Sequence, residues 1–214
     1  MKNAWQDPNP ETIQRLLQGP KPGLEAQRRM APQPRPGWLP GNHVSPRQGS
    51  GLILLYPHRR EVHLVLTRRS ENLGNHRGQI SLPGGRRETG ESAEQAALRE
   101  TSEELGVPPL AVRILGQLTP LYIPPSDFCL TPVVGWTDAR PVWSPDPVEV
   151  AEVLEVSLRC LADPTTRHEK TESRYGATVQ IPFFLVTGHH VWGATAMILE
   201  EFLEVLRAGE HEPK

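Results

Sequence analysis

The sequence lacks the features that mark secreted, membrane-spanning and nucleic-acid-binding proteins. It holds only two cysteines in 214 residues, Cys129 and Cys160, too few for a disulfide framework or a cysteine-based metal site. No run of about 18 apolar residues occurs, so we expect no membrane span. The N-terminal residues also lack the apolar stretch of a secretory signal, and a cytoplasmic location is therefore expected.

Neither charge of one sign nor aromatic residues are in excess. The formal net charge is −2 and aromatic residues make up 6% of the chain, which argues against a nucleic-acid partner. Hydrophobic residues at 37% and charged residues at 22% are typical of a globular protein. Residues 59–87 nevertheless carry seven of the cations, directly before an acid-rich segment. Cations beside clustered carboxylates favour an anionic ligand bridged by a metal ion.

Proline is concentrated at one end of the chain, with 9 of the 23 prolines in residues 1–47. Because proline fixes φ and lacks a backbone N–H, this region cannot form a long helix or a central strand. We expect one short helix at 11–17 within an otherwise extended arm over 1–47, with a loosely ordered tail as the alternative. A folded domain is predicted over 48–209 and a short C-terminal tail over 210–214.

Apolar runs and turn residues divide that domain into strands and a few helices. Strands are predicted at 51–56, 62–67, 79–82, 112–118, 128–136, 148–156 and 179–185. Helices are predicted at 92–105, 157–162 and 194–207, the first of them ending at a glycine. This order of elements indicates an α/β sandwich built on a mixed β-sheet.

Three glutamates lie close together on the predicted helix at 92–105. At about 100° per residue, Glu100, Glu103 and Glu104 share one face. Like charges three and four residues apart destabilise a helix, and their oxygen ligands suit Mg²⁺ or Mn²⁺. A solvated acidic helix face is the alternative. It is disfavoured by the preceding Gly84-Gly85 turn, where the backbone can approach a ligand closely.

The segment from Gly85 to Val107 resembles the signature of the Nudix hydrolase family. That signature is G-x5-E-x7-R-E-U-x-E-E-x-G-U, where U is an apolar residue. All of its fixed residues are present here. The departure is Thr101, which stands where an aliphatic residue is usual and whose methyl group can still pack inward. The motif is long and therefore far more specific than a short glycine motif.

The resemblance implies a Nudix-type α/β/α sandwich and a metal-dependent attack of water on a phosphorus atom of a nucleoside diphosphate derivative. It assigns the metal ligands to Glu100, Glu103 and Glu104, together with the backbone carbonyl near Gly85. Mg²⁺ or Mn²⁺ is the implied cofactor. A non-catalytic ligand sensor with the same fold is an alternative, although such proteins commonly lose these acids.

The same resemblance implies roles beside the metal ligands. Arg99 joins the catalytic candidates and pairs with Glu91 at positions that orient the loop and the helix, and a purely structural role is the alternative. The general base is left open between Glu103 and Glu149, the latter in an acidic stretch at a strand edge. An ordinary surface residue is the alternative for Glu149.

The sequence before the signature resembles the coenzyme A pyrophosphatase subgroup. Its pattern is roughly L-L-T-x-R-S-x3-R-x3-G-x3-F-P-G-G. Gly74 stands where this pattern has its second arginine, and the neighbouring Arg68 or Arg77 could take over the role of that arginine. Residues 118–135 and 191–202 also resemble this group. The pattern is carried by Leu66, Thr67, Arg69, Ser70, Gly78, Pro83, Gly84 and Gly85.

This subgroup resemblance implies a small-molecule substrate, with coenzyme A or its acyl derivatives favoured. The products would be 3′,5′-ADP and 4′-phosphopantetheine or its acyl form. Substrate contacts are expected from Arg68, Arg69, Gly84 and Gly85, because guanidinium groups match phosphate geometry. Surface arginines without a ligand are the alternative. ADP-ribose, NADH and dinucleoside polyphosphates are the other candidate substrates, and the sequence leaves a homodimer open.

Overall fold

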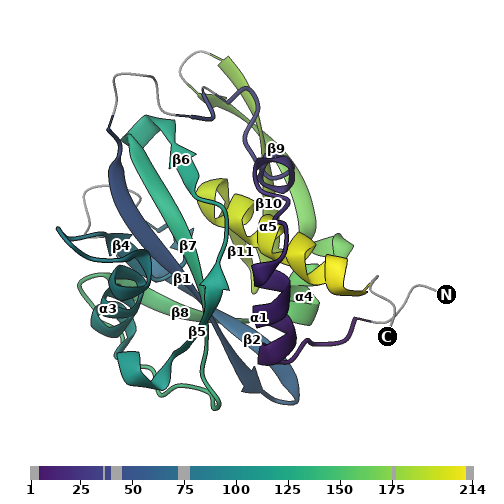
Figure 1. Ribbon diagram of the computed structural model, residues 1–214. Helices are drawn as coiled ribbons and strands as arrows, with labels where there is room; N and C mark the ends of the chain where they lie inside the picture. The colour runs from purple at the N-terminus through teal and green to yellow at the C-terminus, as the bar shows by residue number, and fades with distance from the viewer. Residues whose placement is uncertain (1–4, 36, 40–44, 72–77, 175–176, 211–214) are drawn as a thin grey trace.

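A computed structural model describes residues 5–35, 37–39, 45–71, 78–174 and 177–210 (Figure 1). Gly74 and Arg77 lie outside the described residues. Eight of the strands form one mixed sheet, with the order β3-β2-β1-β7-β5 along its main path. These strands are β1 Arg47–His58, β2 Glu61–Arg69, β3 Ile80–Ser81, β4 Gly84–Arg86, β5 Arg113–Gln117, β6 Leu121–Ile123, β7 Phe128–Trp136 and β8 Val150–Ser157.

Strand β1 is the central element of this sheet. It runs parallel to β7 and antiparallel to β2 and β4. Its side chains alternate between two apolar clusters, with Leu52, Leu54 and Tyr56 in one and Ile53 and Leu55 in the other. Both faces are therefore covered, which explains why β1 is an almost continuous apolar run rather than an alternating one.

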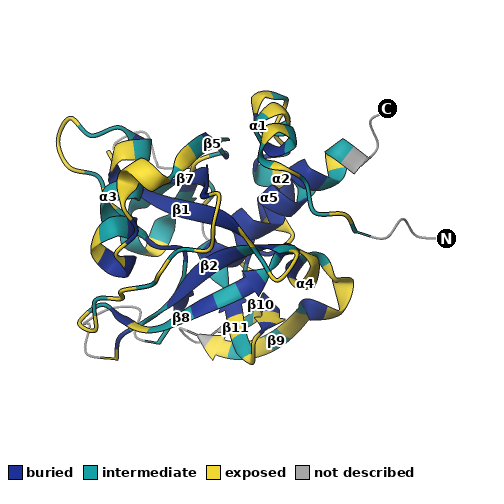
Figure 2. Ribbon diagram, turned by 90° about the horizontal axis from the view of Figure 1, so that it is seen from below, coloured by how far each residue is buried: buried dark blue, intermediate teal, exposed yellow. Residues whose placement is uncertain are grey.

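Helices form the two outer layers, as Figure 2 shows around the buried centre of β1 and β2. Helix α3 (Ala93–Leu105) covers the face that carries Leu52 and Leu54. Helices α1 (Pro10–Gln18) and α5 (Gly193–Glu210) cover the opposite face. The predicted α/β sandwich with a mixed sheet is confirmed. No helix in the described part of the chain is long and apolar enough to cross a membrane.

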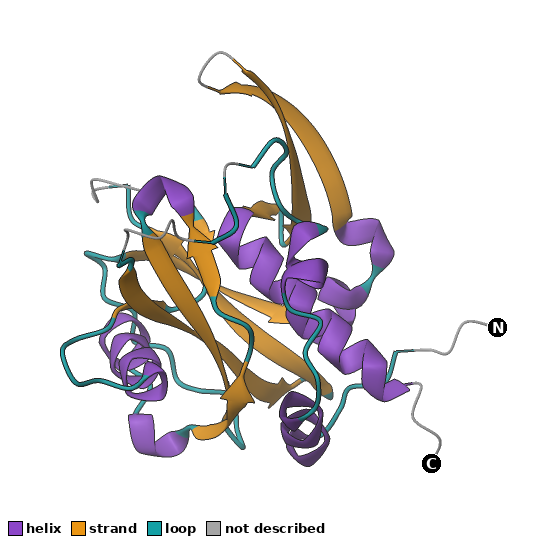
Figure 3. Cartoon of the chain, turned by 45° about the horizontal axis from the view of Figure 1, so that its top comes forward, coloured by secondary structure: helices purple, strands orange, loops and turns teal. Residues whose placement is uncertain are grey.

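A second, three-stranded antiparallel sheet follows the short helix α4 (Leu158–Ala162). It comprises β9 (Arg167–Arg174), β10 (Ala177–Val186) and β11 (His189–Trp192). The hairpin of β9 and β10 projects from the body of the protein (Figure 3). Of these strands, the sequence predicted only the one at 179–185.

The N-terminal segment is more helical than expected. Helix α1 matches the predicted short helix, and its first turn is capped by Asn9, whose Oδ1 accepts a bond from Thr12 N at 2.8 Å. The expectation of an extended chain was wrong at the second helix, α2 (Leu24–Arg28). Gln27 in α2 is fully buried and donates from Nε2 to Glu201 of α5 at 2.7 Å. Ile13 belongs to the main apolar cluster. The segment thus shares the core of the domain.

Candidate active site

Helix α3, whose sequence carries the three predicted acids, lies beside β4 (Figure 1). Its start is fixed by a capping box, in which the Ser92 side chain accepts from Gln95 N and the Gln95 side chain accepts from Ser92 N. Its end is fixed by Gly106, which adopts the left-handed conformation at φ 72°. Both signals are local, and they place the helix where the sequence predicts it.

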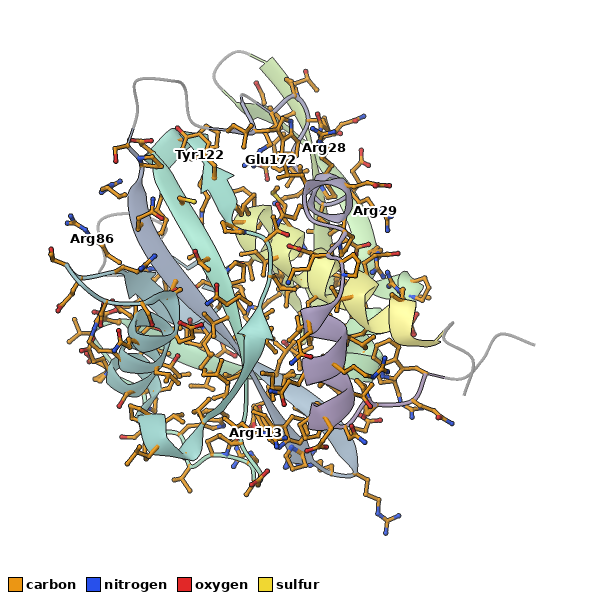
Figure 4. The ribbon with its side chains drawn as sticks, in the orientation of Figure 1. Arg28, Arg29, Arg86, Arg113, Tyr122 and Glu172 are labelled. Atoms are coloured by element: carbon orange, nitrogen blue, oxygen red, sulfur yellow. The ribbon has the colours of Figure 1, made fainter. Side chains whose placement is uncertain are left out.

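The guanidinium of Arg99 makes hydrogen bonds both to the loop before α3 and to acids of α3. Its Nε and Nη2 donate to the Glu91 carboxylate at 2.7 and 3.1 Å, and Nη2 also donates to the Arg86 carbonyl at 3.0 Å. Its Nη1 donates to Glu100 at 2.9 Å and to Glu103 at 3.1 Å. Figure 4 marks Arg86 at the β4 side of α3. One guanidinium is thus bonded to two residues before α3, Arg86 and Glu91, and to two acids of α3.

The hydrogen bonds of Glu91 change its ionisation. Bonds from Arg99 and then from Glu88 N lower the pKa of Glu91 to about 2. The carbonyl of Glu91 also accepts from Arg87 Nη2 at 2.6 Å. Hydrogen bonds from Arg99 thus join Glu91 in the loop to Glu100 and Glu103 of α3.

Glu104 is the most buried of the three acids, with 4% of its surface exposed. Burial raises the pKa of Glu104 to about 8, although Gly84 N donates to its Oε2 at 3.3 Å, and the charges of Glu149 and Glu100 raise it further. Burial also raises the pKa of Glu100, against the opposing effect of Arg99. Negative charge is therefore costly at this face of α3 unless a cation balances it.

The two glycines of β4 allow the loop to approach both β1 and α3. Gly84 pairs with Gly51 and has φ 149°, and an added Cβ would lie 2.2 Å from Ser50 O. A Cβ on Gly85 would lie 2.5 Å from the Glu100 carboxylate carbon. Gly84 is therefore required by its close packing against the β1 backbone, whereas a side chain at Gly85 would force the Glu100 carboxylate to move.

Glu149 lies at the point where β8 begins and β2 ends. Its carbonyl accepts from Ser70 N at 2.8 Å, and its charge raises the pKa of both Glu100 and Glu104. The structure therefore brings Glu149 close to the acids of α3, more than 40 residues away in the sequence. The strand predicted from residue 148 begins two residues later, at Val150, because residues 147–149 form a turn.

The two candidate substrate-binding arginines at the end of β2 differ. Arg68 is engaged by carboxylates, with Nε 3.0 Å from Glu152 and Nη1 3.6 Å from Glu71. The side chain of Arg69 makes no hydrogen bond or ion pair with the residues that the structure describes, and its charge lowers the pKa of Glu104. Of the two side chains, Arg68 is therefore the one that is held in ion pairs within the described part of the chain.

The donor set at this site fits a hard divalent cation. Carboxylate and carbonyl oxygens, as supplied by Glu100, Glu103, Glu104 and Gly85, are the ligands that Mg²⁺ and Mn²⁺ prefer. Within the described ranges, no three acidic, histidine or cysteine side chains already converge in a metal-binding arrangement. In this arrangement Arg99 donates to Glu100 and Glu103, and Gly84 N donates to Glu104.

Comparison with known proteins decides the family. The chain matches the family model of the NUDIX domain over residues 27–173, more than two thirds of its length. The chain belongs to the Nudix hydrolase family. As a Nudix hydrolase, it is a pyrophosphohydrolase, and members of this family generally use divalent metal ions. The match begins inside α2, so the Nudix domain model includes part of the proline-rich segment.

Curated relatives carry the description uncharacterized Nudix hydrolase NudL. The protein from Pectobacterium atrosepticum is 36% identical over 156 residues, which cover 72% of this chain and 80% of the relative. The protein from Yersinia enterocolitica is 31% identical over 173 residues, which cover 80% and 86%.

Solved structures show the same fold. A Nudix hydrolase from M. Smegmatis, RenU, superposes with a TM-score of 0.52 at 17% identity, covering 84% of this chain and 98% of that one. The MutT protein from Methanosarcina mazei Go1 gives a TM-score of 0.51 at 19% identity, covering 80% and 100%. At these identities the likeness extends to the fold alone, and it confirms the predicted Nudix-type sandwich.

Two features of the site were missed by the sequence analysis, one a hydrogen bond and the other a turn. The Arg86 carbonyl, an acceptor for Arg99, gives no signal in a sequence because any residue supplies a carbonyl. The turn at 146–149 that carries Glu149 does have a signal, because Asp146-Pro147 is a pair typical of turns.

Proposed function

We propose that this Nudix hydrolase cleaves the diphosphate of a nucleoside diphosphate derivative, with Mg²⁺ or Mn²⁺ held by Glu100, Glu103, Glu104 and the Gly85 carbonyl. The observation that supports this most strongly is the position of Glu104. It is buried beside Glu100 and within the electrostatic reach of Glu149, which is costly for the ionised protein alone. A bound divalent ion would neutralise the diphosphate oxygens and acidify a water molecule.

The remaining residues divide the work of orientation and proton transfer. Arg99 holds Glu91, Glu100 and Glu103 in one arrangement and acts as a positioning residue. The Glu103 carboxylate is engaged by Arg99 and is 60% exposed, whereas the Glu149 carboxylate has no hydrogen bond to the described residues. A carboxylate oxygen that already accepts a bond from a guanidinium is less available to contact a water molecule. These contacts favour Glu149 over Glu103 as the general base.

Coenzyme A or an acyl derivative is the proposed substrate, with 3′,5′-ADP and 4′-phosphopantetheine or its acyl form as products. The signature around Arg69 and Gly84-Gly85 supports this choice, and the Arg69 side chain, which has no partner among the described residues, could contact a phosphate group. Arg68 is the weaker candidate because Glu152 already binds it. A cytoplasmic location and a homodimer stay predictions.

A substrate panel tests this proposal. The protein is incubated with Mg²⁺ or Mn²⁺ and coenzyme A, ADP-ribose, NADH or a dinucleoside polyphosphate, and the products are separated. Faster cleavage of coenzyme A, with release of 3′,5′-ADP, is the expected result. Preference for another compound would contradict the coenzyme A assignment but not the diphosphate chemistry. No metal-dependent turnover of any compound would contradict the metal assignment and favour a ligand sensor.

A further inference from the structure

A single turn connects the two acids at the centre of the proposed site. Asp146 N donates to the carbonyl of Glu104 at 3.0 Å. The carbonyl of Asp146 accepts from Glu149 N at 3.1 Å and from Val150 N at 2.8 Å. Its side-chain Oδ1 accepts from Val148 N at 2.9 Å. Asp146 therefore contacts the backbone of Glu104 on one side and that of Glu149 on the other.

We propose that Asp146 is a positioning residue, which sets the place of Glu149 relative to Glu104. This inference rests on the proposed function, in which Glu104 binds the metal and Glu149 accepts the proton. Asp146 acts through the shape of its turn, and its own charge is not required.

The bond from Asp146 N to the Glu104 carbonyl follows from the way helix α3 ends. The last carbonyls of a helix have no partner within it. In α3, the carbonyl of Glu104 is bonded by Asp146 N, and the carbonyl of Leu105 is bonded by Ser144 N at 2.9 Å. The loop before β8 is therefore attached to the same helix turn that carries the acids.

The side chain of Asp146 holds the rest of the turn. An aspartate oxygen that accepts the N–H two residues later forms an Asx turn, and Pro147 fixes φ at the intervening position. Beyond the turn, the Glu149 carbonyl is bonded by Ser70 N. Without the Asp146 side chain, Val148 N loses its acceptor, and the segment between Asp146 and Glu149 can change shape. A displacement of a catalytic group by about 1 Å can cost about 100-fold in rate.

The chain provides a matched control. Asp163-Pro164-Thr165 repeats the Asp-Pro sequence, and Asp163 Oδ1 accepts from Thr165 N at 2.9 Å. Thr166 N donates to the Asp163 carbonyl at 3.1 Å, as in the other turn. This second turn follows α4 and packs against α4 and β10, on other elements than the acids of α3. Substitution of Asp163 therefore measures the general effect of losing such a turn.

The experiment compares Asp146→Ala, Asp146→Asn and Asp163→Ala with the wild-type protein. Steady-state kcat and KM are measured with the preferred substrate and saturating metal, and melting temperatures check folding. Asp146→Ala should lower kcat by about 10- to 100-fold with KM nearly unchanged. Asp146→Asn keeps a side-chain oxygen acceptor and should restore kcat, because the turn, not the charge, is required. Asp163→Ala should retain kcat.

A double-mutant cycle with Glu149→Gln identifies the residue through which Asp146 acts. In the Glu149→Gln background, Asp146→Ala should have little further effect on kcat. Equal losses in Asp146→Asn and Asp146→Ala would overturn the inference, as would an equal loss in Asp163→Ala. Normal kcat in Asp146→Ala with impaired Glu149→Gln would overturn it while the proposed base stands. Normal kcat in Glu149→Gln would refute the base and this inference together.

Discussion

The guanidinium of Arg99 donates hydrogen bonds to both carboxylate oxygens of Glu91, with Nε 2.7 Å from one oxygen and Nη2 3.1 Å from the other. Such a two-point bond fixes the orientation of both side chains. It also joins the loop before α3 to the middle of the helix, where the remaining nitrogen of Arg99 holds Glu100 and Glu103. The arrangement of the acids therefore depends on a residue that need not contact the substrate.

This pair predicts a defined dependence of stability on pH. The pKa of Glu91 is about 2 in the folded protein, below its ordinary value of 4.5. Ionised Glu91 therefore stabilises the fold above about pH 4.5, and this contribution is lost as the pH falls through about 2. Glu91→Gln should lower the urea midpoint at pH 7, and its difference from the wild-type protein should shrink below pH 4.5. A difference that is constant from pH 7 to pH 3 would contradict this account.

The parts of the site that the sequence predicts are those determined within one helix and its flanking turns. The spacing of Glu100, Glu103 and Glu104 places them on one face of any helix, whatever surrounds it. Ser92 and Gly106 mark the ends of that helix through bonds to residues within three or four positions. The layers of the sandwich were also predictable, because both faces of β1 needed apolar cover.

The parts that the sequence does not reveal depend on distant partners. Strand β9 (Arg167–Arg174) has no apolar alternation and is defined by backbone pairing with β10. Helix α2 has five residues and rests on burial of Gln27 against Glu201. The ion pair between Arg68 and Glu152 joins residues 84 positions apart. Each of these features requires the fold before it can be inferred.

Glu104→Gln is predicted to abolish most of the activity while the fold remains intact. The substitution keeps the size of the side chain and an acceptor for Gly84 N, but it removes the carboxylate of a proposed metal ligand. We expect kcat to fall by about 100-fold or more, the scale for removing a group that stabilises transition-state charge. The matched control is Glu88→Gln, an exposed acid in the loop before α3, which should retain full activity. Equal activity of Glu104→Gln and the control would refute the metal assignment.

Gly85→Ala and Gly51→Ala are predicted to have opposite outcomes, although the two glycines lie on paired strands. A methyl group on Gly85 would lie 2.5 Å from the Glu100 carboxylate carbon and would displace this proposed metal ligand. We expect kcat to fall by about 10- to 100-fold. A methyl group on Gly51 would lie 3.4 Å from Leu82 Cβ, an ordinary contact, and should leave kcat close to normal. If both variants keep full activity, close packing of Gly85 against Glu100 is not required for catalysis.

Arg69→Met and Arg68→Met separate substrate binding from structural pairing at the end of β2. The side chain of Arg69 has no partner among the described residues, whereas Arg68 lies 3.0 Å from Glu152. Loss of one charge-assisted hydrogen bond to a phosphate corresponds to about 1.5–3 kcal/mol, so Arg69→Met should lower kcat/KM by about tenfold or more. Arg68→Met should mainly affect stability, seen as a lower urea midpoint with kcat/KM within about threefold of normal. The reverse order of effects on kcat/KM would assign phosphate recognition to Arg68, and would mean that a substrate phosphate displaces Glu152 from it.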